Sequence, residues 1–93
     1  MKAIWQGVVL ADSDDTVVVE NNHYFPRSAL HMAHFSDSIR TSFCPWKGEA
    51  RYFNVLVDEQ SNPDAAWYYP DPKAAASEIR DRVAFWRGVQ VVE

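Results

Sequence analysis

The residue with the most distinctive chemistry in this sequence is its single cysteine, Cys44, within the string Cys-Pro-Trp-Lys-Gly at residues 44–48. A thiolate is a nucleophile, and a neighbouring cation favours its formation. In a catalytic interpretation Cys44 attacks an electrophile, His23 serves as its base and Lys47 holds the negative charge of the substrate. Free cysteine is also among the most buried residue types, so the sequence leaves a reactive thiol and a packed one both open.

A second set of candidates is mostly aromatic and stands beside proline- or glycine-bearing breaks in the chain. Its members are Tyr24, Trp46, Lys47, Trp67 and Tyr69. Aromatic rings line pockets for flat ligands, and a lysine attracts an anionic group. We therefore predict that Tyr24, Cys44, Trp46, Lys47 and at least one of Trp67 and Tyr69 converge on one preformed cleft. The alternative is that these rings form the core of a small domain.

The sequence offers little for metals, cofactors or nucleic acids. His31 and His34 are three residues apart with Asp37 close by, but no third ligand stands out, so we predict neither a metal site nor a cofactor. The formal net charge is −4, and the basic residues are scattered. Nucleic-acid scaffolds normally carry a basic face, and phosphate sites a glycine-rich loop. We expect no nucleic-acid partner; a small planar or anionic ligand remains open.

The elements that must position these residues are mainly strands, in one domain spanning residues 1–93. Alternating or β-branched runs predict strands at 8–10, 16–20, 39–43, 49–58, 65–69 and 89–92. Turn-forming residues at 11–15 indicate a hairpin between the first two runs, and those at 61–64 indicate another turn. Gly7 predicts a bulge or tight turn, and residues 27–38 read as a loop with one helical turn.

One C-terminal helix is predicted after Pro70. Asp71 suits its N-cap and Pro72 its first position. Ala75, Ile79 and Val83 then follow at four-residue spacing, which gives a narrow apolar stripe. In an alternative interpretation, residues 83–86 already belong to a strand. The fold class is therefore mainly β, with curled or paired sheets and one helix covering a face.

Three strings resemble the bacterial family known as domain of unknown function 427, sometimes labelled nucleotidyltransferase-like. They are Asn-His-Tyr-Phe-Pro at 22–26, Cys-Pro-Trp-Lys-Gly at 44–48 and Ala-Trp-Tyr-Tyr-Pro-Asp-Pro at 66–72. The resemblance implies a β-tent-like fold, in which two antiparallel sheets meet at an angle. Related tents hold zinc with two cysteine pairs, so a chain whose only cysteine is Cys44 is expected to lack that site.

Three functions follow from these patterns. The first is a small-molecule-binding domain with an aromatic cleft near the cysteine, and the second a cysteine-dependent enzyme acting on a small electrophile. The third is a protein-interaction domain that uses an exposed edge or aromatic patch, with no partner identified. A single cysteine, no apparent N-terminal signal and no apolar run near 20 residues predict a cytoplasmic protein without a membrane partner.

Overall fold

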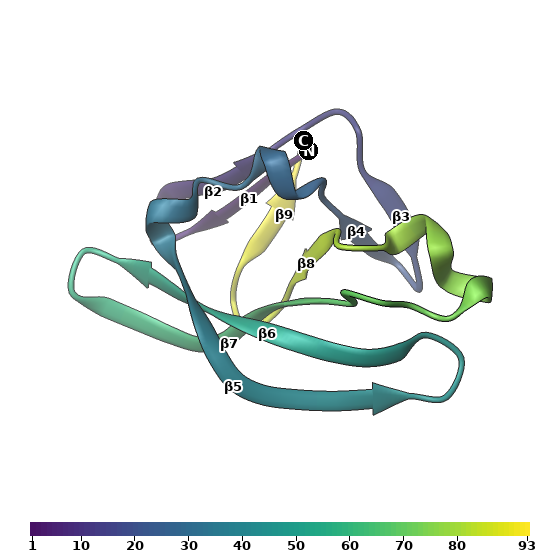
Figure 1. Ribbon diagram of the computed structural model, residues 1–93. Coiled ribbons are helices and arrows are strands. Elements are labelled where there is room, and N and C mark those ends of the chain that lie inside the picture. Colours follow the sequence, from purple (N-terminus) through teal and green to yellow (C-terminus); the bar gives the residue numbers. More distant parts are fainter.

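The computed structural model describes all residues from 1 to 93, and its strands form three antiparallel sheets (Figure 1). The three-stranded sheet has the order β2-β1-β9, from Val8–Asp12, Lys2–Trp5 and Gln90–Val92. The four-stranded sheet has the order β5-β6-β7-β8, from Phe35–Cys44, Gly48–Val57, Gln60–Tyr68 and Val83–Phe85. A small sheet joins β3 (Val17–Val19) to β4 (Asn22–Tyr24). The prediction of a mainly β chain is confirmed.

Two-residue turns close the N-terminal hairpins, and the acidic segment 11–15 closes none. Gln6 and Gly7 have φ values of 52° and 74° between β1 and β2, and Glu20 and Asn21 have 53° and 66° between β3 and β4. Positive φ at both central residues is typical of type I′ turns, whose twist matches that of antiparallel strands. The hairpin predicted between 8–10 and 16–20 is therefore wrong, because segment 11–15 connects two different sheets.

The turn predicted at 61–64 is also wrong, since β7 runs through this segment. The chain turns earlier, where Asp58 has a φ of 53°. Pro63 is tolerated in the strand because the β6–β7 register shifts between Phe53 and Val55, and pairing with β8 begins only at Ala66. At such a bulge no ladder bond needs the N–H that proline lacks.

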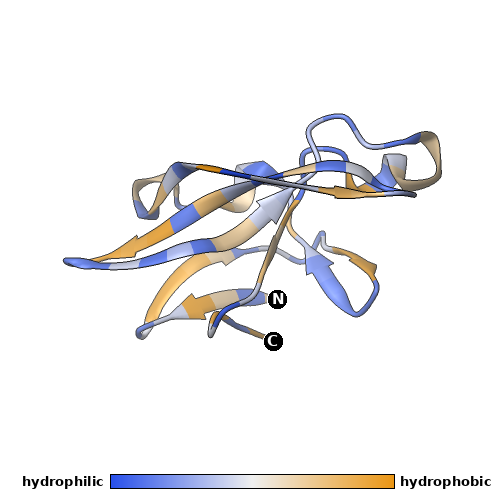
Figure 2. Ribbon diagram, turned by 90° about the horizontal axis from the view of Figure 1, so that it is seen from below, coloured by the Kyte–Doolittle hydropathy of each residue, from blue (hydrophilic) through white to orange (hydrophobic).

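The four-stranded sheet contributes to two apolar cores, because successive strand residues point to opposite faces. A cluster of 13 buried residues joins this sheet to β1 and β2, with Phe25 and Phe85 in edge-to-face contact at 5.6 Å. Figure 2 shows apolar residues along the strands and a hydrophilic β6–β7 turn. The second cluster lies on the other face; its members are Tyr24, Ala50, Tyr52, Tyr69, Ala76, Ile79 and Ala84.

The predicted C-terminal helix is absent. Only a 3-10 element, η3 (Ala74–Ile79), forms, and Ala76 interrupts it with φ −119° and ψ 23°. The N-cap position is Lys73, with no side-chain cap, whereas the Asp71 carboxylate pairs with the exposed Arg80 at 3.1 Å.

Tertiary anchors explain this correction. The N–H of Lys73 donates to the carbonyl of Lys47 at 2.9 Å, and the N–H of Asp81 donates to the carbonyl of Tyr69 at 3.0 Å. The stretch between these anchors is shorter than the roughly 12–15 residues at which an isolated helix becomes stable. Val83 then belongs to β8, as the alternative interpretation held.

The connection between β4 and β5 contains two short 3-10 turns, η1 (Arg27–Ala29) and η2 (Met32–His34), where one was expected. It leads into β5, which forms one edge of the four-stranded sheet and leaves Ile39 fully exposed. The structure contains no helix that is long and apolar enough to cross a membrane.

Candidate functional site

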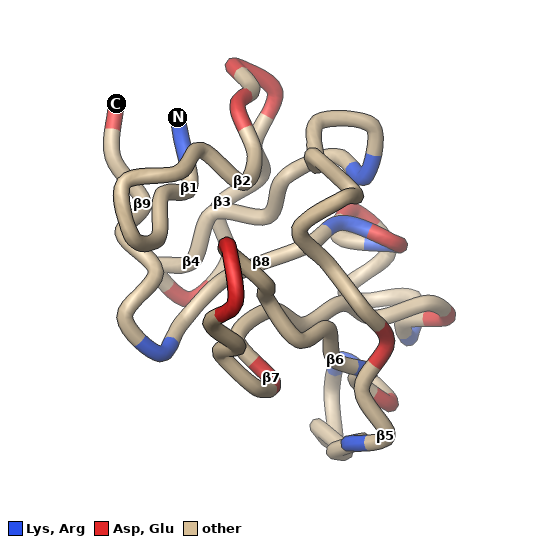
Figure 3. Tube along the Cα trace, turned by 90° about the vertical axis from the view of Figure 1, so that its left-hand side faces the viewer, with Lys and Arg blue, Asp and Glu red and all other residues tan.

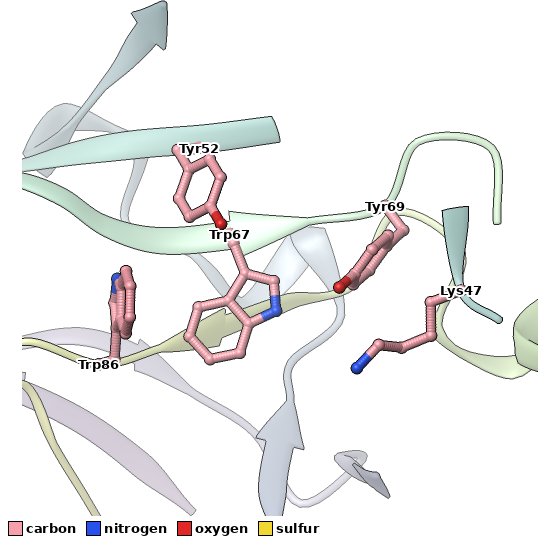
Figure 4. A pocket seen from close by; sticks show the side chains of 5 residues that line it. All are labelled: Lys47, Tyr52, Trp67, Tyr69 and Trp86. Carbon is pink, nitrogen blue, oxygen red and sulfur yellow. The ribbon is translucent and has the colours of Figure 1, made fainter. Parts of the chain in front are cut away.

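An open cavity of about 190 Å³ lies on the face of the four-stranded sheet that carries the second cluster. Its lining residues are Lys47, Tyr52, Trp67, Tyr69 and Trp86 (Figure 4). Drug-sized ligands occupy pockets of roughly 300–1,000 Å³, whereas a cavity of about 150 Å³ holds benzene. The space therefore suits one planar ring with a small substituent.

Strand register creates the aromatic walls. Tyr52 on β6 lies opposite Trp67 on β7, and Trp67 lies opposite Ala84 on β8. Because Ala84 has only a methyl group, the sheet face is hollow at this point. Trp86, two residues further on, closes the space: its ring lies 5.8 Å from that of Trp67 at 76°, and 6.4 Å from that of Tyr52 at 35°.

The polar atom of each of these three walls is already hydrogen-bonded within the protein. The pairs are Trp67 Nε1 donating to Tyr24 Oη at 3.1 Å, Trp86 Nε1 donating to the carbonyl of Asp64, and Tyr52 Oη with Ser42 Oγ at 2.8 Å. A tryptophan offers no other polar atom. These walls are therefore held in place and present ring faces to a ligand.

Lys47 enters the cavity from the turn between β5 and β6 (Figure 4). Gly48 has a φ of 109°, and a Cβ at this position would lie 3.5 Å from the carbonyl oxygen of Asp71. Glycine adopts such a backbone without steric cost. Together with the hydrogen bond from the Lys73 N–H to the Lys47 carbonyl, this packing fixes the turn against residues 71–73. The Lys47 side chain is consequently buried, with 8% of the residue exposed.

The Lys47 ammonium forms an ion pair with the Glu20 carboxylate and lies 5.6 Å from the ring centre of Tyr69 and 5.2 Å from that of Trp46. Burial alone would lower the pKa of Lys47, but the hydrogen bond to Glu20 and the neighbouring phenols outweigh it and raise that pKa. Lys47 is therefore a fixed positive charge at neutral pH. It suits anion binding better than nucleophilic attack.

The two tyrosines beside Lys47 keep their protons. Burial raises the pKa of Tyr69 to about 12, although the charge of Lys47 opposes the rise. Burial also raises the pKa of Tyr24, against the effects of the hydrogen bond from Trp67 and the Lys47 charge. Unlike Tyr24 and Tyr52, Tyr69 has no hydrogen-bond partner for its hydroxyl in the protein. That hydroxyl is free to donate to a ligand.

Charges of both signs are spread along the chain trace (Figure 3). Because salt screens exposed charges over about 8 Å at physiological ionic strength, the charged groups nearest the cavity determine the electrostatic potential inside it. Besides Lys47 and Glu20, two exposed arginines stack on the walls: the guanidinium of Arg40 lies 5.2 Å from the Tyr52 ring centre, and that of Arg87 lies 4.6 Å from a Trp86 ring centre. Arg87 also pairs with the Asp64 carboxylate at 3.9 Å, and Lys47 is the one cation that lines the cavity itself.

Residues 1–93 match the family described as a domain of unknown function, DUF427. The chain belongs to the DUF427 family. No curated protein matches it. In this DUF427 chain the strings that carried the resemblance meet at the cavity: residues 44–48 supply Lys47, residues 66–72 supply Trp67 and Tyr69, and residues 22–26 supply Tyr24 behind the Trp67 wall.

The structure brings three of the DUF427 chain's seven predicted site residues into the cavity lining. Lys47, Trp67 and Tyr69 line the cavity. Tyr24 is fully buried outside the cavity lining, and its hydroxyl accepts the hydrogen bond from Trp67. Trp46 is 41% exposed and lies beside the Lys47 ammonium, outside the cavity lining. Their roles toward a ligand stay predictions.

The predicted catalytic pair is not seen in contact. Cys44 is half-buried and packs against the second cluster, outside the cavity lining. The His23 ring instead pairs through Nδ1 with Thr16 Oγ1 at 2.9 Å. His31 Nδ1 pairs with the backbone carbonyl of residue 9, and His34 Nδ1 pairs with that of residue 56. His31 precedes the 3-10 turn η2 and His34 ends it, so both bonds attach this turn to neighbouring strands.

Sequence reasoning missed two walls of the cavity, Tyr52 and Trp86. The signal for Tyr52 was its place in the predicted strand 49–58, but only the register puts it opposite Trp67. The signal for Trp86 was its position two residues after Ala84, because alternate residues along a strand point to the same face of the sheet. This alternation alone does not reveal which face of the sheet holds a cavity.

Proposed function

We propose that this chain is a small-molecule-binding domain whose aromatic cavity takes a planar ligand with a negatively charged group. One observation carries the proposal: the polar groups that the lining offers to a ligand, the Lys47 ammonium and the Tyr69 hydroxyl, lie together at one end of the cavity (Figure 4). An ammonium has three N–H donors, and Glu20 accepts from one of them. The opposite end consists of Trp67, Trp86 and Tyr52.

This arrangement fits a ligand with two distinct ends. An aromatic ring would contact the faces of Trp67 and Trp86, where offset or edge-on contacts are favourable. A carboxylate would accept hydrogen bonds from Lys47 and Tyr69. At about 190 Å³ the cavity favours a single-ring ligand over a nucleoside triphosphate.

Benzoate is a direct probe of this proposal. We expect it to bind the full chain, with a change in tryptophan fluorescence, because it combines a flat ring with one carboxylate. Benzamide should bind about tenfold more weakly, since a hydrogen bond to a charged group contributes about 1.5–3 kcal/mol. Cyclohexanecarboxylate, which lacks a flat ring, should also bind more weakly. Isothermal titration calorimetry measures all three affinities; equal affinities, or no binding by any, would contradict the proposal.

A cysteine-dependent enzyme is the second candidate, because Cys44 packs on the same cluster as Tyr69, beside Lys47. If Cys44 is an activated nucleophile, iodoacetamide should alkylate it at least about tenfold faster at pH 7 than it alkylates glutathione, as expected for a thiol held largely as thiolate. Mass spectrometry against time measures this rate. A rate at or below that of glutathione would count against the enzyme.

The architecture and location complete the proposal. We infer that the three- and four-stranded sheets form a β-tent without its zinc site, since Cys44 alone cannot replace two cysteine pairs. The unpaired thiol favours a reducing compartment, so we place the domain in a bacterial cytoplasm. Binding of another chain at the exposed edge strand β5 stays a prediction.

A further inference from the structure

We infer that Glu20 is an internal counter-ion that a ligand carboxylate must replace, one for one, on Lys47. This inference rests on the proposed function. It gives the site a built-in competitor and makes planar monocarboxylates its preferred ligand class. Glu20 thus becomes a specificity-determining residue, although it lies outside the cavity lining.

The two partners of this ion pair differ sharply in exposure. The Lys47 side chain is 10% exposed, whereas that of Glu20 is 54% exposed. Lys47 is also fixed through its backbone carbonyl, which accepts a hydrogen bond from Lys73. When the pair opens, the Glu20 carboxylate is therefore hydrated by the surrounding water, while the ammonium remains in the cavity.

The backbone at Glu20 supports a role for its side chain. Glu20 and Asn21 form the tip of the β3–β4 hairpin, both with positive φ. Type I′ turns favour asparagine, aspartate and glycine at such positions, and glutamate is not among them. A glutamate here gains nothing from the turn itself, but it places its carboxylate on Lys47.

Charge balance selects the ligand class. Lys47 is the one cationic residue in the cavity lining, and its pair with Glu20 is neutral overall. A monocarboxylate that takes the place of Glu20 restores this neutrality, and its two oxygens match the ammonium and the Tyr69 hydroxyl. A dianion such as a phosphate ester would leave one charge unpaired beside a desolvated cluster.

The test compares Glu20→Gln with the wild-type chain and with Glu59→Gln. Glu59 is an exposed residue of the β6–β7 turn, so its substitution makes the same change in net charge away from the cavity. We expect Glu20→Gln to bind benzoate about fivefold more tightly, because a competitor that holds most of the Lys47 population is removed. Benzamide affinity should stay the same in all three proteins, and Glu59→Gln should match the wild type for both probes.

Calorimetric titration separates the possible failures. If the wild type binds benzoate but Glu20→Gln binds it no more tightly, the counter-ion inference is wrong and the proposed function stands. If neither protein binds benzoate, both are wrong. Glu20→Asn is the second variant, because asparagine suits the left-handed turn and keeps the hairpin formed: it should show the same gain in affinity for benzoate. A gain for benzamide as large as for benzoate would also overturn the inference.

Discussion

Replacing Lys47 with methionine is expected to lower the affinity for benzoate by about 10- to 100-fold, the range that corresponds to losing a hydrogen bond to a charged group. The ammonium is buried and faces the aromatic cavity, so no neighbouring lysine or arginine of the lining can take its place. Methionine has a similar length and no charge, so the cavity should keep its shape. Calorimetric titration of benzoate into both proteins measures the loss.

Lys73→Met provides the matched control. Lys73 belongs to the segment that packs against the same turn, but it is exposed and its ammonium donates to the carbonyl of Pro45 at 2.7 Å. This control should bind benzoate about as tightly as the wild type. Benzamide affinity should change less than benzoate affinity in Lys47→Met. Retention of wild-type benzoate affinity by a folded Lys47→Met protein would remove the basis of the proposed function.

Local sequence patterns located most strands and three of the five lining residues. The residue patterns of 39–43 and 49–58 reflect strands whose successive side chains point to opposite faces of the sheet. The breaks at 44–48 and 70–72 predicted where site residues gather, because proline and glycine interrupt strands and such interruptions lie at the ends of a sheet. Register was beyond these patterns. The cavity depends on which residue faces which, as in the pairing of Trp67 with Ala84.

The wrong predictions share one cause, which is that long-range contacts overrode correct local signals. Asp71 and Pro72 form a good helix start in isolation, yet the backbone of Lys73 is bound to Lys47, far away in the sequence. The acidic segment 11–15 has turn chemistry, but the two-residue turns on either side already close the hairpins. Glu20 was overlooked for the same reason, because only the packing of β3–β4 beside the β5–β6 turn makes it the partner of Lys47.

Raising the pH from 10 to 12 is expected to destabilise the protein steeply, through the cluster around Lys47. Below pH 10 Tyr69 is protonated in both states and has no effect. Between its unfolded pKa near 10 and its folded pKa of about 12, it ionises in the unfolded chain first. The free energy of unfolding then falls by at most about 1.4 kcal/mol per pH unit, which gives a loss of at most about 2.3 kcal/mol by pH 12, and solvent in the open cavity reduces it. The raised pKa values of Tyr24 and Lys47 act in the same direction, since both groups also favour the protonated folded state.

Urea unfolding at pH 9, 10, 11 and 12 measures this slope, and Tyr69→Phe isolates the contribution of Tyr69. The groups that face Lys47 are Glu20, Tyr24 and Tyr69, with Cys44 packed against the same cluster, so the three raised pKa values belong to one set of neighbouring side chains. Because the Tyr69 hydroxyl has no protein partner, Tyr69→Phe should be about as stable as the wild type at pH 9 and lose markedly less by pH 12. Tyr68→Phe, on the opposite face of the sheet, should keep the wild-type dependence of stability on pH.

A wild-type stability that stays level up to pH 12 would contradict this prediction. It would mean that the Tyr69 phenol ionises as readily in the folded protein as in water, and therefore that the cavity is far more hydrated than its geometry implies.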